Sequence, residues 1–212
     1  MKQWIHGDTG HFDRWSATYD RSLLQRLLFD PVHRRVCAAL MEGHLPGTVV
    51  DVGCGTGRLV EMIRHRLPEA ELVGIDPSDG MVSVARTRFA GVLGVRIEAG
   101  SARDLPLESG SADVVTTTLS FHHWDEPGDS LREVVRVLRP GGRLLLADVL
   151  GIGFFGRLAG SLGNRDGSAF RDAGELSSLL TKAGFASWRR RRIFGPGIPL
   201  FLVEARVGRL GG

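Results

Sequence analysis

The sequence predicts an α/β fold: a doubly wound, seven-stranded, mostly parallel sheet with an antiparallel C-terminal hairpin and helices on both faces. Extended apolar runs alternate with segments of helical period along most of the chain. Strands that alternate with helices form a mostly parallel sheet covered on both faces. Only the turn at residues 195–197 separates the last two strand-like segments, and so short a turn allows only an antiparallel pair.

Each element follows from a local pattern. Apolar residues at helical spacing, such as Val60, Ile63 and Leu67, indicate helices, and the Pro-Gly-Gly at residues 140–142 is expected to stop the third of them. Apolar runs bounded by turn residues indicate strands. In chain order we expect strand 49–52, helix 60–67, strand 71–76, helix 82–89, strands 94–99 and 112–119, helix 131–138, strand 143–150, helix 176–183, and strands 187–194 and 199–207.

The N-terminal part departs from this rhythm. Residues 20–42 look helical, with a break at Asp30–Pro31 because proline disfavours helical geometry in the residue before it. We expect these helices to lean over the ligand-binding edge of the sheet. The 212 residues show no repeat or composition break, so we expect one compact domain: an N-terminal helical cap segment at 1–44 and a core domain at 45–209.

Composition limits the function classes. The 27 Lys+Arg against 24 Asp+Glu give a formal charge of +3, a weak hint of an anionic partner. The two cysteines, Cys37 and Cys54, are far apart and support neither a disulfide framework nor a metal site. The N-terminus lacks a signal-peptide core, and no apolar run approaches the ~18 residues that span a bilayer. We therefore expect a cytoplasmic protein without a membrane partner.

The loop DVGCGTG at Asp51–Gly57 indicates the ligand. A glycine-rich turn between a strand and a helix lets a ligand approach the backbone, and Asp76, at the end of the second strand, can accept both hydroxyls of a ribose. A dinucleotide fingerprint needs glycine where this chain has Arg58. Asp51 disfavours a pyrophosphate but suits a ligand with an ammonium and a sulfonium. This combination predicts S-adenosylmethionine, and the alternative is that both acids only cap a helix and a turn.

Several segments resemble the Rossmann-like S-adenosylmethionine-dependent methyltransferases, in the subgroup that includes quinone-biosynthesis and many small-molecule methyltransferases. The resemblance covers nearly the whole chain. The segments that carry it are Asp51–Gly57, Gly74–Ser78 with Met81, Ala102–Pro106, Ser111–Val115 and Leu138–Leu144.

The resemblance implies roles for individual residues. The loop at Gly53 faces the methionine part of the cofactor, Asp76 the ribose, Met81 the adenine face and Ala102 the adenine edge. The cofactor-binding residues expected from motif and resemblance together are Tyr19, Asp51, Gly53, Cys54, Gly55, Gly57, Asp76, Pro77, Met81, Ser101, Ala102 and Leu119.

Some of these residues also have simpler interpretations. The subgroup usually has an acid where this chain has Ser101, so we expect weaker cofactor binding. Met81 could be a core residue only. Cys54 stands near a helix start, a setting that can depress a thiol pKa, but no histidine or second cysteine beside it makes it a nucleophile. Tyr19 belongs to an aromatic N-terminal segment that could close over the ligand or only anchor a helix.

A pair of histidines follows the fourth predicted strand. Methyl transfer mainly needs alignment, with a base only where the nucleophile holds a proton. Histidine is the side chain whose unperturbed pKa lies nearest neutrality, so His122 or His123 is the candidate base. Alternation along an extended segment would point only one of them at the substrate, and we favour His123. Either residue could instead only shape the pocket.

The function predicted is methyl transfer to a small, apolar or aromatic metabolite by a monomer or homodimer. The alternatives are a methyltransferase that acts on a macromolecule and a non-catalytic S-adenosylmethionine-binding protein. The arginine run at 189–192 suits a sheet edge better than a nucleic-acid surface, so no nucleic acid is expected. Substrate recognition is left to residues 1–30, 120–128 and 151–172.

Overall fold

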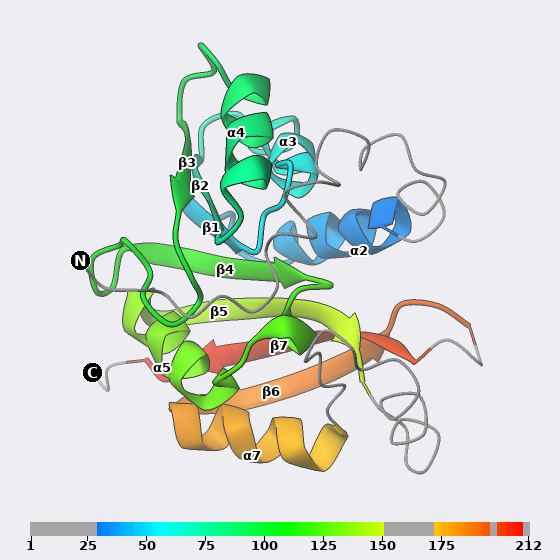
Figure 1. The fold of residues 1–212 in the computed structure, drawn as a ribbon. Coiled ribbons are helices and arrows are strands. Elements are labelled where there is room, and N and C mark those ends of the chain that lie inside the picture. The colour runs from blue at the N-terminus through cyan, green and yellow to red at the C-terminus, as the bar shows by residue number, and fades with distance from the viewer. Residues whose placement is uncertain (1–28, 151–171, 196–198, 210–212) are drawn as a thin grey trace.

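The computed structural model describes residues 29–150, 172–195 and 199–209, which build one seven-stranded sheet with helices on both faces (Figure 1). The strand order is β3-β2-β1-β4-β5-β7-β6. The strands are β1 (Thr48–Val52), β2 (Glu71–Asp76), β3 (Val95–Ala99), β4 (Ala112–Thr118), β5 (Leu138–Val149), β6 (Phe185–Arg192) and β7 (Leu200–Val207).

Strand β1 lies where the order of strand addition reverses: β2 and β3 extend the sheet on one side of it, and β4 and β5 extend it on the other. It pairs in parallel with β2 on one side and with β4 on the other, and β7 alone runs antiparallel to its neighbours β5 and β6. The predicted fold, including the antiparallel C-terminal hairpin, is therefore confirmed. Open α/β sheets bind ligands beyond the carboxyl ends of the strands at such a point.

The helices cover the two faces through separate apolar clusters. Along β5, Leu145 faces the first cluster and Leu144 and Leu146 face the second, as alternation along a strand requires. The first cluster lies under α2 (Asp30–Leu40), α3 (Arg58–Arg64) and α4 (Asp79–Arg88); the second lies under the short 3-10 helix η2 (Phe121–His123), α5 (Pro127–Val137) and α7 (Ala173–Ala183). Among the described helices, none is long and apolar enough to cross a bilayer.

Helix α2 begins where the sequence predicts a break. Asp30 is its first residue and Pro31 follows in the first turn, where the missing N–H of proline costs nothing. Contrary to the expectation, the body of α2 does not lean over the edge of the sheet: Val36 and Leu40 are buried in the first cluster, because the helix carries an apolar stripe that packs on the sheet face. Its N-terminal end lies on the side of the sheet toward which β4 and β5 point (Figure 1). Residues 20–28 lie outside the described part.

The boundary between α5 and β5 corrects a second expectation. Leu138 was expected to close the helical stripe, but its backbone is extended (φ −72°, ψ 137°) and pairs with Ala112. The strand therefore begins before Pro140 rather than after Gly142, and the ladder with β4 continues at Arg143 after an irregularity. Proline disfavours helical geometry only in the residue before it, so the helix could have reached Leu138; tertiary pairing ends it earlier.

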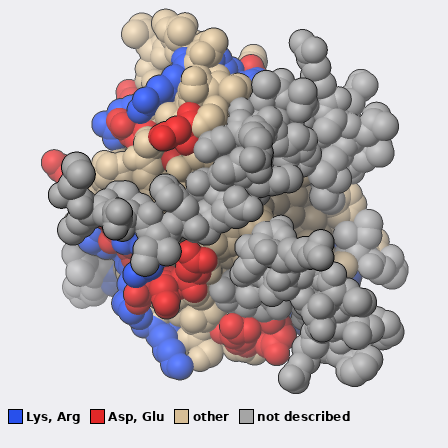
Figure 2. Space-filling view, viewed as in Figure 1, with Lys and Arg blue, Asp and Glu red and all other residues tan. Residues whose placement is uncertain are grey.

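The arginine run at 189–192 lies on β6, the edge strand of the sheet, as predicted. The first and third arginines pair with Glu42 or Glu204, while the second and fourth lie over the ring of Phe201 at 5.2 and 4.7 Å. On the face shown in Figure 2, basic side chains of the described residues are interspersed with acidic ones. The run therefore has structural partners on both faces of its strand.

A buried charge cluster joins β7 to β5 and α2. Glu204 is 3% exposed and accepts hydrogen bonds from Arg189, while Arg143 lies 3.6 Å away and is itself buried. Burial favours the neutral acid, but the neighbouring arginines, Arg189 first, outweigh burial and hold the pKa of Glu204 below its usual value. Arg143 also donates a hydrogen bond to the carbonyl of Leu40, at the end of α2.

Replacing Glu204 tests this cluster. Glu204→Gln keeps the shape of the side chain but leaves the Arg143 guanidinium buried without its counter-ion, which should lower the free energy of unfolding by about 3–5 kcal/mol. Urea denaturation measures the loss. The matched control is Glu42→Gln, which removes an exposed partner of Arg189 and Arg191 and should change stability by less than about 1 kcal/mol. Equal effects of the two changes would contradict a buried cluster.

Candidate functional site

The loop after β1 is held against the end of β2 by its backbone. The amides of Gly53 and Cys54 both donate to the carbonyl of Ile75, at 2.8 and 3.1 Å, and the amide of Gly57 donates to the carbonyl of Cys54. Gly53, Gly55 and Gly57 have φ values of +76°, +53° and +82°, which side-chain-bearing residues rarely adopt. The three predicted glycines therefore shape one tight loop.

The surroundings of these glycines differ in an informative way. An added Cβ at Gly53 would lie 2.1 Å from the hydroxyl of Ser120, and one at Gly57 would lie 2.6 Å from the ring of Phe89. At Gly55 the added atom would meet no described atom within 4 Å. Two glycines are required by protein packing, and the third leaves room for a ligand to approach the backbone.

Asp76 ties the loop to the start of α4. One carboxylate oxygen accepts the amide of Gly55 at 2.8 Å, and the other accepts the amide of Ser78 at 2.9 Å. A carboxylate offers about four acceptor positions, so these two bonds fix its orientation and leave acceptor capacity for a diol. The predicted ribose acceptor is thus held rigidly beside the glycine loop.

Asp51 is a buried acid without a cationic partner among the described residues. It is 2% exposed, and its one hydrogen bond that the structure shows comes from the hydroxyl of Thr116 at 2.7 Å. Burial raises the pKa of Asp51 to about 7; the Thr116 bond opposes the rise and the charge of Asp76 adds to it. A ligand that brings a positive charge would relieve this strain, and a pyrophosphate would increase it.

The segment after β4 packs directly on the glycine loop. Leu119 has φ +50° and is the one described non-glycine residue with a positive φ; its amide donates to the carbonyl of Ala147 at 2.8 Å. Such backbone strain gathers at ligand sites. The side chain of Ser120, the next residue, lies where a Cβ on Gly53 would be. The histidines that follow are therefore brought to the edge where the loop lies.

His122 forms a dyad with Asp148, at the end of β5. The ring Nδ1 lies 2.8 and 3.1 Å from the two carboxylate oxygens, and the His122 amide donates to the same group. Asp148 is 1% exposed and also accepts the amide of Val149. With Nδ1–H donating to the acid, the tautomer assigned by this contact places the lone pair on Nε2.

His123 is exposed, and the expected alternation does not apply. The segment is a 3-10 turn rather than an extended strand, so the two histidine rings lie side by side with centroids 4.0 Å apart. Sequence reasoning missed Asp148, because an acid inside a strand carries no local sign of a partner 26 residues away.

His33 is a second residue that sequence reasoning missed. It lies 5% exposed in the first turns of α2, and its Nε2 is 3.3 Å from the hydroxyl of Thr118, at the end of β4. Burial lowers the pKa of His33 to about 4, with Asp30 opposing and Arg58 adding to the effect, so the ring is neutral. Its Nδ1 has no hydrogen-bond partner among the residues that the structure describes. The ion pair of Arg58 with Asp30, at 2.8 Å, holds this turn beside the glycine loop.

The remaining predicted cofactor residues lie around α4 and the loop after β3. Met81 is 3% exposed in the first turn of α4, a position that fits either a core residue or a contact with the cofactor. Pro77 is exposed and Ala102 half-buried. The hydroxyl of Ser101 accepts the amide of Arg103 at 3.3 Å within its own turn.

The two cysteines are free and buried. Burial raises the pKa of the Cys54 thiol well above its usual value, with the charges of Asp76 and Asp51 adding to the rise. The loop therefore does not depress this pKa, and Cys54 is a small neutral residue of the turn. Tyr19 and residues 151–171 lie outside the described part of the chain.

The comparisons with known proteins agree with this geometry. Residues 50–146 match a family model described as "Methyltransferase domain". The chain carries a Rossmann-like, S-adenosylmethionine-dependent methyltransferase domain.

Relatives and solved structures place this methyltransferase domain more closely. The chain is 33% identical over 183 residues to a malonyl-(acyl-carrier protein) O-methyltransferase of Dechloromonas aromatica, covering 83% of this chain and 64% of the relative. It is 38% identical over 130 residues to a demethylmenaquinone methyltransferase of Deinococcus radiodurans, covering 59% and 54%. The chain thus spans 64% of the first relative and 54% of the second.

A crystal structure from Thermotoga maritima, described as a SAM-dependent methyltransferase and possible histamine N-methyltransferase, shares the fold. The TM-score is 0.72 at 24% identity, and the match covers 92% of this chain and 97% of that one. Family and fold imply S-adenosylmethionine as the cofactor of the methyltransferase domain. The buried acid without a cation and the open side of Gly55 fit that group.

The titration of Asp51 gives a pH test. A cationic cofactor binds the ionised acid, so with a pKa of about 7 in the free protein, the dissociation constant of S-adenosylmethionine should fall roughly tenfold from pH 6 to pH 8. Calorimetry at constant ionic strength measures it. Asp51→Asn should bind more weakly at pH 8 and lose this slope; an unchanged slope in the variant would show that Asp51 is not the titrating group.

Asp76 gives a second binding test. Asp76→Ala should weaken S-adenosylmethionine binding by about 1.5–3 kcal/mol, the worth of charge-assisted hydrogen bonds to a ribose. The matched control is Asp79→Ala. Asp79 is an exposed acid in the first turn of α4, and this variant should bind the cofactor as the parent does. Melting temperatures of both variants establish that the fold persists. Parent-like affinity in folded Asp76→Ala would remove this residue from the site.

Proposed function

We propose that the protein transfers a methyl group from S-adenosylmethionine to a small, apolar or aromatic metabolite, with His122 as the proton acceptor. The observation that carries the proposal is the His122–Asp148 dyad beside the glycine loop. A histidine oriented by a buried acid is the arrangement of a general base. It supports a nucleophile that loses a proton on methylation and speaks against a binding protein without turnover.

Different residues would bind the cofactor and accept the proton of the substrate. The cofactor supplies an activated methyl group, whose carbon–sulfur bond breaks as the bond to the acceptor forms. Asp51 provides negative charge for the cationic end of the cofactor, Asp76 accepts the ribose hydroxyls, and the glycine loop admits its backbone contacts. His122 accepts the proton of the nucleophile at Nε2, while Asp148 holds the ring and stabilises its charged form.

The names of the relatives leave the acceptor open between oxygen and carbon. One relative is named for malonyl-(acyl-carrier protein) O-methylation and another for demethylmenaquinone methylation. Methylation of a carbon or of a hydroxyl removes a proton from the accepting atom, in agreement with a base at His122, whereas a carboxylate acceptor needs no base. We extend the proposal to a cytoplasmic monomer or homodimer that does not act on nucleic acid; the ion pairs of the 189–192 run support the last point.

The activity is tested by a turnover screen with methyl-labelled cofactor against cell metabolites, with the product mass identifying the acceptor. Labelled small molecules are expected. Label confined to protein or nucleic acid would favour the macromolecular alternative, and tight cofactor binding with no labelled product would favour the non-catalytic one.

The dyad is tested on the substrate so found. His122→Ala should lower kcat by about 10²- to 10⁴-fold, the usual contribution of a general base. Asp148→Asn should lower kcat and shift the pH–rate profile, because it acts only through the ring. His123→Ala should keep most of the activity. A loss seen with His123→Ala alone would transfer the role to that residue.

A further inference from the structure

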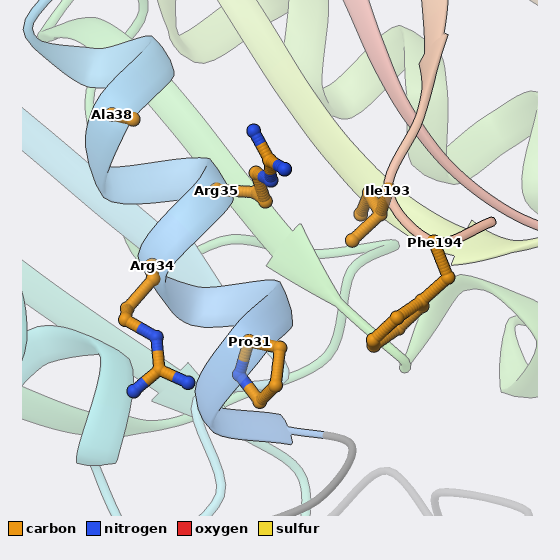
Figure 3. A pocket seen from close by; sticks show the side chains of 6 residues that line it. All are labelled: Pro31, Arg34, Arg35, Ala38, Ile193 and Phe194. Carbon is orange, nitrogen blue, oxygen red and sulfur yellow. The ribbon is translucent and has the colours of Figure 1, made fainter.

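An open cavity of about 460 Å³ lies between α2 and the end of β6. Its walls combine apolar surface with two guanidinium groups. It is lined by Pro31, Arg34, Arg35, Ala38, Ile193 and Phe194 (Figure 3). In this view Arg35 extends from α2 toward Ile193, whereas Arg34 leaves the helix on the other side, away from Phe194.

The cavity belongs to the same edge of the sheet as the dyad. The amide of Ile193 donates to the carbonyl of Leu200, and the amide of Leu150 donates to the carbonyl of Pro199. Leu150 lies two residues after Asp148 at the carboxyl end of β5. Figure 1 shows the start of α2 and the connection between β6 and β7 at this end of the strands. A ligand in the cavity would therefore lie on the side where substrate enters.

The two arginines of the cavity, Arg34 and Arg35, are not paired with the acids at either end of α2. Asp30, one helical turn before Arg34, pairs instead with Arg58 at 2.8 Å. Glu42, the acid at the other end of α2, pairs with the arginines of β6. Within the described residues, neither Arg34 nor Arg35 forms an ion pair. Two adjacent, exposed cations beside apolar walls are thus free to pair with an anion from outside the described chain.

We propose that this cavity binds an amphipathic anion: a carboxylate or phosphate held by Arg35, with its apolar body against Pro31, Ile193 and Phe194. Guanidinium recognises both oxyanions through paired N–H donors, and the apolar walls select a ligand that carries a hydrocarbon part. Assigning the site to the methyl-accepting substrate, which would then be an apolar acid or phosphate ester, rests on the proposed function. Binding of the anion to this cavity does not rest on the proposed function.

The binding test uses decanoate, decyl phosphate and decanol, each titrated into the full chain by calorimetry. Decanoate or decyl phosphate should bind and decanol should not, and the tighter anion identifies the head group. Inorganic phosphate should bind much more weakly than decyl phosphate, because it lacks the apolar part. Equal binding of decanol and decanoate, or no binding of either anion, would overturn the proposal.

Variants locate the site. Arg35→Gln should weaken the better anion roughly 10- to 100-fold, Arg35→Lys should retain most of the binding, and Arg34→Gln should have a smaller effect. Arg132→Gln, on α5 across the sheet, makes the same charge change and should have none. An equal loss of anion affinity with Arg132→Gln would show that the effect comes from net charge and not from this cavity.

The two proposals can fail separately. S-adenosylhomocysteine binding should be unchanged in Arg35→Gln. Anion binding that depends on Arg35 in a protein without methyl transfer would leave the cavity assigned and refute the proposed function. Methyl transfer to a neutral substrate, unaffected by Arg35→Gln, would refute the substrate assignment.

Discussion

The buried carboxylate of Asp51 is the constraint around which the ligand edge is built. It lies near the end of β1, close to a second acid, Asp76, and no described cation balances it. The fold tolerates this because the pKa of Asp51 is raised to about 7, so the group is partly neutral at physiological pH. The Thr116 hydroxyl and the open side of Gly55 complete an environment suited to a cationic ligand rather than to a polyanion.

Alternation along the strands separates two kinds of chemistry at one edge. Asp51 and Thr116 project toward the face covered by α2, α3 and α4, because their neighbours Val50 and Val115 face the other cluster. Asp148 projects toward the η2 face by the same rule, since Leu144 and Leu146 lie there. Asp51 and Asp148 thus lie on opposite faces of the sheet, so the proposed cofactor-binding acid and the proposed proton acceptor can meet only beyond its carboxyl ends.

The parts of this architecture that sequence could predict are those encoded by local pattern. The strand at residues 71–76 and the glycine loop were predicted because hydrophobic period and turn chemistry act within a few residues. The end of α5 was not, since pairing of Leu138 with Ala112 is a tertiary effect. His33 and Asp148 were missed for the same reason: their partners lie 85 and 26 residues away, and no spacing rule marks them.

The charge that Asp51 faces changes during turnover, and this gives the raised pKa a consequence. If Asp51 faces the sulfonium of S-adenosylmethionine, as we propose, the acid would be ionised most readily with that cofactor bound, and methyl transfer would leave a neutral thioether beside it. The acid then loses part of its compensation in a buried site, where an unpaired carboxylate is costly. Because its pKa in the free protein is already near neutrality, Asp51 can take up a proton as the product leaves. On this proposal, the same burial that favours a cationic cofactor would disfavour retention of the product, so one side chain would influence both binding and release.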